Sequence, residues 1–476
     1  MTDTLTPHRT ETPAALRSPG RWIEHWEPED PKFWASVGRR TARRNLIFSI
    51  FAEHLGFSIW VIWSILVVQM GTLKDSAGVA LFPDLVANQA NATKIFWLVA
   101  LPNLVGSFIR IPYTLAVARF GGRNWTVISA LLLLIPTSLA LYCVTHSGTP
   151  YWLLLLASVT AGFGGGNFAS SMANISYFYP ERQKGVALGL NAAGGNIGLS
   201  SMQFFMPVVL FLGLSLSFAT AMWLPLIVLA AVCAFLFMDN LHIARSSLRE
   251  QFAAAKRTHA WIMSFLYIGT FGSFLGLAAS FPATLKFVFP DDQKFNLLGS
   301  GLVLPIAFVG PLVGSLARPF GGWLADRIGG ARVTAVVFAL MAVCSFGAIY
   351  AADHRNLALF IASMLVLFTM AGAGNGSTYR MIPAIFKRRS DTAIAREPSK
   401  ARHLVIQARR EGAATLGMAG AIGASGGFIL PKTIGDSIKA TNGITVAFSW
   451  FIAMYVVCLV ITCAVYVRKG TTMSGV

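Results

Sequence analysis

The chain is poor in charged residues. Only 12% of its 476 residues are Asp, Glu, Lys or Arg, against about 25% in an average soluble protein. Hydrophobic residues make up 55%, and the mean hydropathy is +0.62. Apolar residues in this excess must face lipid as well as a core. The composition excludes an ordinary soluble domain and predicts an all-α membrane protein.

Cysteine is also scarce, and its placement excludes further classes. The five cysteines stand singly in apolar runs, without the spacing of a metal or redox site, so we expect them to pack as small apolar residues: Cys143, Cys233, Cys344, Cys458 and Cys463. Neither a nucleophile elbow nor a phosphate-binding loop is visible in the sequence. We therefore expect no metal, no cofactor and no enzymatic activity.

Long apolar runs take the place of these features. A run of about 20 residues crosses a hydrocarbon core of about 30 Å. We predict twelve transmembrane helices, at 45–70, 95–118, 125–145, 151–179, 185–212, 218–238, 261–288, 299–324, 332–352, 357–386, 412–436 and 442–467. The domains that follow are a tail (1–44), a six-helix half (45–238), a linker (239–260), a second six-helix half (261–467) and a short tail (468–476).

Acidic residues are few, with 20 Asp and Glu against 38 Lys and Arg, so the net charge is +18. The basic residues gather on one side of the predicted bundle. The two tails and the loops on their side hold 28 of the 38, and the opposite loops hold 7. The positive-inside rule then places both termini in the cytoplasm, in a bacterial-type inner membrane. This distribution explains the net charge without nucleic acid as a partner.

The two predicted halves share sequence features at a constant offset of 208 residues. Arg110 pairs with Arg318 at this offset, within GSFIR (106–110) and GSLAR (314–318). The same offset relates Gly166-Asn167 to Gly374-Asn375. Two parallel halves with a site at their interface are the architecture of many secondary transporters.

The two arginines at symmetric positions are the main candidates for a binding site. Each lies nine residues, or about 13 Å, before a loop arginine, which places Arg110 and Arg318 near the middle of the bilayer. A guanidinium there is costly, and its planar fork of donors fits a planar oxyanion. The alternative is structural pairing with carboxylates, but Glu53 is the only clear acid within a predicted span.

Glu53 and Arg380 are candidates for coupling. Glu53 lies nine residues into the first predicted helix, and a carboxylate in the membrane can take up and release a proton. The alternative is an ion pair with an arginine such as Arg380. Arg380 lies about 10 Å from the cytoplasmic residue Lys387 and could instead reach the membrane surface.

Two predicted helices, the fifth and the eleventh, are rich in glycine. Residues 187–198 read ALGLNAAGGNIG, and residues 415–427 read TLGMAGAIGASGG. Their matched glycines permit close backbone approach, at Gly189 and Gly417, Gly195 and Gly423, and Gly198 and Gly426. Asn191 and Asn196 add polar groups that need partners. Helix packing alone is the alternative, but a narrow polar site would suit a small, rigid ion.

The loop after the eighth predicted helix carries the most specific short motif. Residues 321–332 read GGWLADRIGGAR and resemble the loop motif of the major facilitator superfamily. The first half keeps a degenerate copy, 119–123, with Ala118 in place of the acid. We predict that Asp326, Arg327 and Arg332 form a conformational switch whose ion pairs differ between states. A tight basic turn that only fixes topology is the alternative.

Longer stretches extend the resemblance along nearly the whole chain. They include WEPEDPKFW (26–34), RIPY (110–113), GGRNWT (121–126) and, most specifically, NFASSMANIS (167–176). The chain resembles the NarK/NarU-type nitrate/nitrite porters of the major facilitator superfamily. The resemblance implies the major facilitator fold of twelve helices in two pseudo-symmetric halves, and it makes the two glycine-rich helices the family's nitrate signatures.

The resemblance also implies roles for individual residues. Arg110 and Arg318 would bind the anion, with the remaining candidate substrate-site residues packing around it or lining its path: Phe57, Phe168, Asn191, Asn196, Tyr267 and Phe271. The expected activity is transport of nitrate and nitrite by alternating access, as nitrate/nitrite exchange or with protons. A phosphate or organophosphate porter and a non-transporting anion sensor are alternatives. We expect a monomer in contact with lipid.

Overall fold

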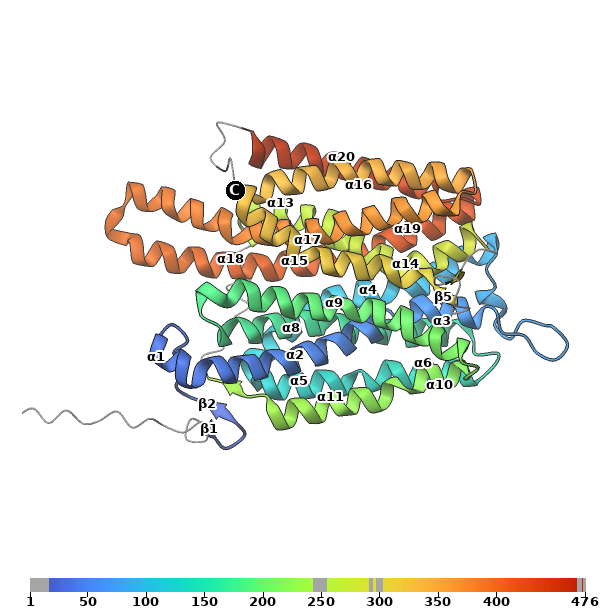
Figure 1. Cartoon of the computed structure of the whole chain (residues 1–476), viewed down its shortest axis with the longest axis horizontal. Coiled ribbons are helices and arrows are strands. Elements are labelled where there is room, and N and C mark those ends of the chain that lie inside the picture. Colours follow the sequence, from blue (N-terminus) through green and yellow to red (C-terminus); the bar gives the residue numbers. More distant parts are fainter. Residues whose placement is uncertain (1–16, 243–254, 291–293, 297–302, 469–472, 474–476) are drawn as a thin grey trace, which may run out of the picture.

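The computed structural model describes residues 17–242, 255–290, 294–296, 303–468 and 473. It is a bundle of long helices running roughly side by side (Figure 1). We call the end of the bundle that carries α1, β1 and the C-terminus the terminal end, and the opposite end the distal end. Within these residues, ten helical segments are long and apolar enough to cross a membrane, which confirms the all-α membrane fold.

The N-terminal half begins with a short helix and a π-helical turn that lead into the first span. Its helices are α1 (Pro31–Phe33), η1 (Trp34–Gly38), α2 (Arg39–Trp60), α3 (Ile62–Met70), α4 (Ala92–Phe120), α5 (Gly122–Leu132), α6 (Leu134–Thr145), α7 (Tyr151–Ala161), α8 (Phe163–Phe178), α9 (Glu181–Phe211), α10 (Leu216–Ala221) and α11 (Trp223–Phe237). Two 3₁₀ turns, η2 (Pro83–Leu85) and η3 (Gln89–Asn91), lie between α3 and α4.

The C-terminal half repeats the pattern of long helices. It contains α13 (Thr258–Tyr267), η4 (Ile268–Gly272), α14 (Ser273–Val288), η6 (Ile306–Phe308), α15 (Val309–Ile328), α16 (Gly330–Asp353), α17 (Leu357–Arg396), η7 (Pro398–Lys400), α18 (Ala401–Ala424), α19 (Gly426–Thr441), α20 (Thr445–Thr462) and η8 (Cys463–Val467). Five short strands complete the described structure: β1 (Arg17–Ser18), β2 (Trp22–Ile23), β3 (Asn240–Leu241), β4 (Lys294–Asn296) and β5 (Val303–Pro305).

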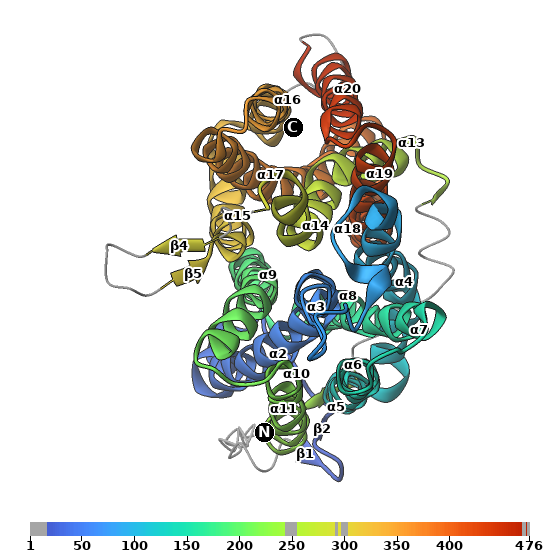
Figure 2. The same cartoon turned by 90° about the vertical axis from the view of Figure 1, so that its right-hand side faces the viewer.

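Two predicted spans, α9 and α15, are less apolar than the ten segments counted above and are not among them. Both are long enough to cross, but they carry glycines and polar or charged residues. They lie side by side where the two halves meet, as Figure 2 shows in end view. Helices at such an interface face protein more than lipid, so low hydropathy is expected of them. The predicted number of twelve spans depends on including these two.

The eighth span begins later than predicted. The apolar pattern indicated a helix over 299–324, but α15 starts at Val309. Residues 303–305 form β5, which pairs antiparallel with β4, and 299–302 lie outside the described residues. Hydropathy alone does not distinguish a short apolar strand from the first turns of a helix, and this accounts for the error.

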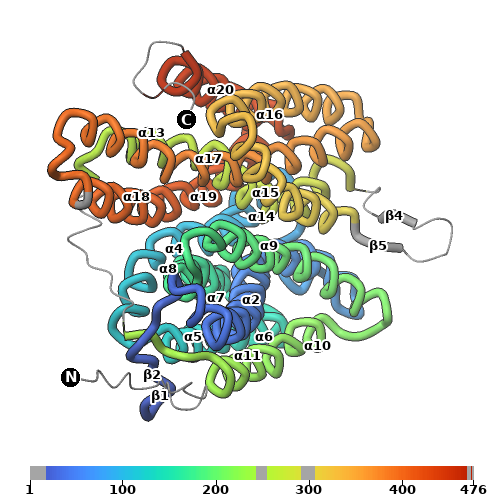
Figure 3. Tube along the Cα trace, turned by 60° about the vertical axis from the view of Figure 1, so that its left-hand side comes forward, coloured from blue at the N-terminus to red at the C-terminus, as the bar shows by residue number. Residues whose placement is uncertain are grey.

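The polar stretch 387–411 is helical, although it was expected only as a loop region. Helix α17 continues to Arg396, and α18 begins at Ala401 after the turn η7. The two helices project beyond the bundle at the terminal end as a helical hairpin (Figure 1, Figure 3). Lys, Arg, Gln and Ala are good helix formers whatever their hydropathy, so the helices continue after they leave the apolar layer.

The equivalence of the two halves extends to backbone conformation. Helices α4 and α15 both end at a glycine with positive φ, Gly121 (φ 85°) and Gly329 (φ 93°). These positions are related by the offset of 208 residues found in the sequence. L-residues with a side chain rarely adopt this conformation, so each glycine allows the chain to turn sharply into the next helix.

The tail predicted as residues 1–44 is folded from Arg17 onward. Strand β1 pairs antiparallel with β2, and β2 pairs in parallel with β3, which follows α11. We call residues 17–38 the N-terminal strap. The indole of Trp26 in the strap donates a hydrogen bond to the Tyr177 carbonyl at the end of α8 (3.1 Å). The strap therefore binds the terminal end of the N-terminal half.

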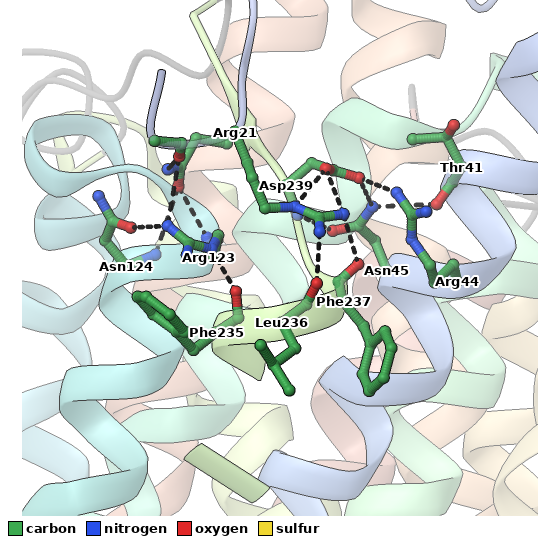
Figure 4. A network of polar contacts seen from close by, with 12 residues as sticks. Arg21, Thr41, Arg44, Asn45, Arg123, Asn124, Phe235, Leu236, Phe237 and Asp239 are labelled. Carbon is green, nitrogen blue, oxygen red and sulfur yellow. Dashed lines mark hydrogen bonds and ion pairs between the residues drawn. The ribbon is translucent and has the colours of Figure 1, made fainter. Parts of the chain in front are cut away.

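Asp239 holds the centre of this arrangement (Figure 4). Its buried carboxylate accepts hydrogen bonds from Arg21 of the strap (3.0 Å), from Arg44 and from Asn45 (3.1 Å). Arg21 also donates to the last carbonyls of α11, at Leu236 and Phe237. One side chain thus ties the strap, the start of α2 and the end of α11 together. The predicted division of the halves at 239–260 stays a prediction, and 243–254 lie outside the described residues.

Contacts between the halves include a group near the distal end. Gln203 of α9 donates to the Ala278 carbonyl of α14 (2.6 Å). Phe96 contacts Phe287 with ring centroids 5.8 Å apart, and Phe204 contacts Phe308 at 4.9 Å. These pairs hold the distal ends of the two halves together. At the terminal end, a cavity of about 730 Å³ lies within the C-terminal half, between α15 and α17.

Candidate substrate site

The two symmetric arginines meet at the centre of the bundle. Arg110 lies on α4 and Arg318 on α15, and both are buried. Their guanidinium carbons lie over the same two rings: Arg110 is 4.7 Å from the Phe168 ring centre and 5.0 Å from that of Phe271. Arg318 is 5.3 and 6.0 Å from the same centres. The structure therefore brings four of the predicted substrate-site residues together.

The aromatic residues form a continuous stack across the interface of the halves. The rings of Phe168 and Phe271 are stacked at 5.9 Å, and those of Phe271 and Tyr267 at 5.1 Å. Phe57 contacts Phe168 edge-on at 6.0 Å and lies one ring further from the arginines. The π-helical turn η4 contains Phe271 and directly follows Tyr267.

Each arginine keeps an unsatisfied donor. Arg110 donates through Nε to the Gly165 carbonyl (3.2 Å) and through one terminal nitrogen to the Gly420 carbonyl (2.8 Å). Its other terminal nitrogen is buried without a partner, as is one terminal nitrogen of Arg318. Neither guanidinium forms an ion pair within the described part of the chain. Two unneutralised cations with free donors in an apolar core make a site for an anion.

Glu53 does not neutralise the arginines by direct pairing. Its carboxylate accepts hydrogen bonds from Ser171 and from the Asn191 amide (2.5 Å), both on the same oxygen, Oε2. The other oxygen, Oε1, is buried without a hydrogen-bond partner. Among the described residues Glu53 has no ion pair, so the interpretation as a partner of Arg380 is wrong. Asn191 donates one of these bonds, and its predicted role at the substrate site stays a prediction.

The asparagines of the core are incompletely satisfied. Asn196 is buried, and neither its side-chain oxygen nor its nitrogen has a partner; the same holds for Asn167 on α8. Asn375 accepts a hydrogen bond from the Tyr267 hydroxyl (2.5 Å), but its nitrogen has no partner. Buried amides without partners are rare in proteins. Here they are groups that a polar solute could satisfy.

The loop motif forms an ion pair within its own half. Asp326 accepts a hydrogen bond from Arg380 of α17 (2.6 Å), and both side chains are about half exposed. Arg327 lies over the Trp323 ring at 4.2 Å, and Arg332 is exposed. Arg380 also approaches the N-terminal half, because a Cβ placed on Gly185 of α9 would lie 3.3 Å from its guanidinium. The pair lines the terminal-end cavity, away from the central arginines.

Among the described residues, no group of three or more His, Cys, Asp or Glu is arranged to hold a metal ion. The five cysteines have no disulfide partner.

Comparison with known proteins supports the architecture. Residues 30–395 match the family model described as Major Facilitator Superfamily. The chain belongs to the Major Facilitator Superfamily. It is 36% identical to the nitrate/nitrite transporter NarU of Escherichia coli (strain K12), covering 94% of this chain and 96% of that protein. It is 34% identical to the probable nitrate/nitrite antiporter NarK2 of Thermus thermophilus, covering 95% and 98%.

Two solved transporter structures share the fold at low sequence identity. The D-xylose-proton symporter matches with a TM-score of 0.63 and 14% identity, over 89% of this chain and 97% of that chain. The nucleoside transporter NupG matches with a TM-score of 0.58 and 12% identity, over 88% and 99%. These matches concern the fold alone, because proteins of one superfamily fold carry different substrates.

The six glycines predicted as signature positions fall into two groups. Four contact another element directly: a Cβ on Gly195 would meet the Glu53 carboxyl, one on Gly198 the His54 carbonyl, one on Gly423 the Tyr267 ring and one on Gly426 the backbone of Gly272. The other two, Gly189 and Gly417, have nothing within 4 Å of such a Cβ. Close approach therefore explains the first four and not the last two.

This division leads to a matched prediction on one helix. Gly195→Ala is expected to destabilise the protein by about 1–3 kcal/mol, because overpacking a filled core costs about this much and the added Cβ would lie 2.7 Å from the Glu53 Cδ. Gly189→Ala should be neutral or slightly stabilising, since the site is open and alanine favours a helix. Melting temperatures of the two purified variants test this, and equal effects would contradict it.

Several residues of the site were not predicted. The carbonyls of Gly165 and Gly420 hold Arg110, and Ser171 holds Glu53. Tyr379 lies 5.7 Å from Arg318 and Trp60 5.4 Å from Arg110. Two missed residues left a signal: Asn375, which the 208-residue offset relates to Asn167, and Ser171, which lies within the stretch 167–176. Gly165 and Gly420 act through backbone carbonyls, and no motif marks the roles of Tyr379 and Trp60.

Proposed function

We propose that the chain carries nitrate and nitrite across the bacterial inner membrane, by alternating access of one site between its two halves. The observation that supports this most is the central pair of buried arginines, each with an unsatisfied donor and no carboxylate partner within the described residues. A small planar anion would accept hydrogen bonds from both guanidiniums and offset one of their two positive charges, which lowers their mutual repulsion. The full-length similarity to NarU and NarK2 supports the same substrates.

A phosphate or organophosphate porter is less well supported. A larger dianion would favour further cations at the site, but around the arginines the described structure shows aromatic rings and unsatisfied amides. His54 is the candidate for such a further cation, but its Nδ1 hydrogen-bonds the Gly194 carbonyl (3.1 Å). A sensor that does not transport is also less well supported. The half-exposed ion pair between Asp326 and Arg380 suits a transporter in which such pairs differ between states.

The direction of insertion and the oligomeric state complete the proposal. The basic residues favour cytoplasmic termini, so the terminal end with its cavity would face the cytoplasm. Contacts near the distal end would then close the site toward the outside. The two halves together enclose the arginine pair in one chain, so a monomer would suffice for transport.

Flux measured in proteoliposomes tests the function. We expect entry of external nitrate when nitrite is trapped inside, because an empty site with two repelling guanidiniums should resist switching. The measurement is repeated without internal nitrite and with an imposed proton gradient. Uptake that requires nitrite indicates an exchanger, and uptake driven by protons alone indicates a symporter. The absence of nitrate flux under every condition would overturn the proposal.

Glu53→Gln separates the two coupling modes. Glutamine keeps the shape of the side chain and can still accept hydrogen bonds from Ser171 and Asn191, but it cannot exchange a proton at this position. For an exchanger we expect nitrate/nitrite flux within about threefold of the unmodified protein, corresponding to less than about 1 kcal/mol. For a symporter we expect proton-driven uptake to be abolished while counterflow persists. Loss of counterflow in a correctly folded variant would contradict both expectations.

A further inference from the structure

A groove on the outside of the N-terminal half lies between α2 and α9 at the terminal end. We call it the α2–α9 groove. It is about 620 Å³ in volume, and its mouth is lined by Trp34, Tyr179, Arg39 and Arg182. The rings of Trp34 and Tyr179 contact each other at 5.7 Å. Amphipathic aromatic rings of this kind are enriched at the level of lipid headgroups.

The polarity of the groove changes with depth. Helices α2 and α9 both run from the terminal end toward the distal end, so residue number measures depth on both. Arg39 lies seven residues, or about 10 Å, above Leu46, and Arg182 lies eight residues, or about 12 Å, above Leu190. Two cations therefore mark the outer end of the groove, and apolar side chains line its inner part.

The apolar part of the groove is open. On α9, Val186 is 68% exposed and Leu190 53% exposed, and both line the groove. In a chain that spans a membrane, apolar side chains at this depth lie in the hydrocarbon layer. The groove thus offers an acyl chain a wall of α9 on one side and Leu46 of α2 on the other.

The two arginines at the mouth have no carboxylate partner. Neither Arg39 nor Arg182 takes part in an ion pair or hydrogen bond among the described residues, and both are exposed. The nearest acid in sequence, Glu181, is paired with Lys184 at 2.6 Å. Two guanidiniums at headgroup level, above an apolar channel, match a phosphate joined to acyl chains.

We propose that the α2–α9 groove binds one anionic phospholipid, with the phosphate between Arg39 and Arg182 and an acyl chain along Leu46, Val186 and Leu190. Charge complementarity selects an anionic over a zwitterionic lipid, because the latter brings its own cation to the same place. The groove is separate from the central arginine pair. The proposal rests on the chain spanning a membrane and not on the proposed substrate.

Native mass spectrometry of the full chain in detergent tests the proposal. Phosphatidylglycerol and phosphatidylcholine with identical acyl chains are titrated separately, and the fraction of protein carrying one lipid is measured. We expect tighter binding of phosphatidylglycerol. Arg39→Gln with Arg182→Gln should weaken it about tenfold or more, since hydrogen bonds to charged groups contribute on this scale. The binding of phosphatidylcholine should change little.

Two further variants make the test specific. Arg396→Gln with Lys400→Gln removes the same charge from the α17–α18 hairpin and should leave lipid binding unchanged. Val186→Glu places a carboxylate one helical turn from Arg182, where it can pair with that arginine, and should weaken binding while keeping both guanidiniums. Equal loss in the hairpin variant, no loss in the groove variants, or competition by inorganic phosphate at the concentration of the lipid would overturn the proposal.

Discussion

Arg318→Lys and Arg110→Lys are each expected to lower nitrate transport at limiting nitrate by about 100-fold or more. Lysine keeps the charge but removes the planar fork, which offers two parallel donors to one oxyanion. Each charge-assisted hydrogen bond contributes about 1.5–3 kcal/mol, and about 1.4 kcal/mol corresponds to a factor of ten. The loss of one or two such bonds gives the expected magnitude.

The structure sharpens the expectation for Arg110. Its Nε and one terminal nitrogen already bind the carbonyls of Gly165 and Gly420, from both halves of the bundle. A lysine ammonium cannot hold two carbonyls in different directions and also present a donor to the anion. Arg110→Lys should therefore also loosen the contact between α4 and α18, whereas Arg318→Lys should affect binding alone.

Uptake into proteoliposomes measures the effect, and nitrate binding to the purified variants separates affinity from turnover. Arg396→Lys serves as the matched control, because this arginine lies at the exposed end of α17. Melting temperatures show whether each variant is folded. Near-normal uptake by both folded variants would refute the assignment of the site to this pair.

Part of the site could be predicted from the sequence, because a constant offset relates the two halves of the chain. Arg110 and Arg318 were found through one offset and their depth in predicted helices. Their approach to the rings of Phe168 and Phe271 depends on how the helices α4, α8, α15 and η4 pack together. No local sequence pattern encodes that packing. For the same reason the hydrogen bond between Asn191 and Glu53 was not predicted.

The fold was predicted best for the helices whose surface faces lipid. Hydropathy locates helices whose surface faces the membrane, and ten of the expected spans satisfy that criterion. The helices α9 and α15, predicted from the runs 185–212 and 299–324, are less apolar than these ten because they face the other half of the protein. Hydropathy also does not show that α17 and α18 extend through the polar stretch 387–411, because the length of a helix and its contact with lipid are separate properties. The two-residue strands of the strap are too short to show any periodicity.

The strap also changes the interpretation of the degenerate loop motif. In the C-terminal half the acid Asp326 pairs with Arg380, and both are half exposed. In the N-terminal half Ala118 stands where the acid would be. The corresponding end of this half is held by Asp239, which is buried and bound by two arginines and Asn45. One half thus has a pair that water can reach, and the other has a buried network.

Asp239→Ala is therefore expected to destabilise the protein by about 3 kcal/mol. Breaking a buried ion pair by removing one partner costs about 3–5 kcal/mol, and the lower end applies because Arg21 and Arg44 are partly exposed and can be rehydrated. The Asn45 amide is buried and cannot be rehydrated in this way. Asp436→Ala is the control. Asp436 forms an exposed ion pair with Lys432, one helical turn away, and such a pair contributes about 0.5 kcal/mol or less.

Thermal unfolding in detergent measures both variants, and transport distinguishes two roles for the network. If the strap holds α2, α5 and α11 together at the terminal end so that they move as one body, Asp239→Ala should also lower the rate of the proposed nitrate/nitrite exchange without changing the affinity for nitrate. Arg21→Ala should reproduce part of both effects, because it releases the strap while leaving Arg44 on the carboxylate. A melting temperature equal to that of Asp436→Ala would show that the buried network does not stabilise this half.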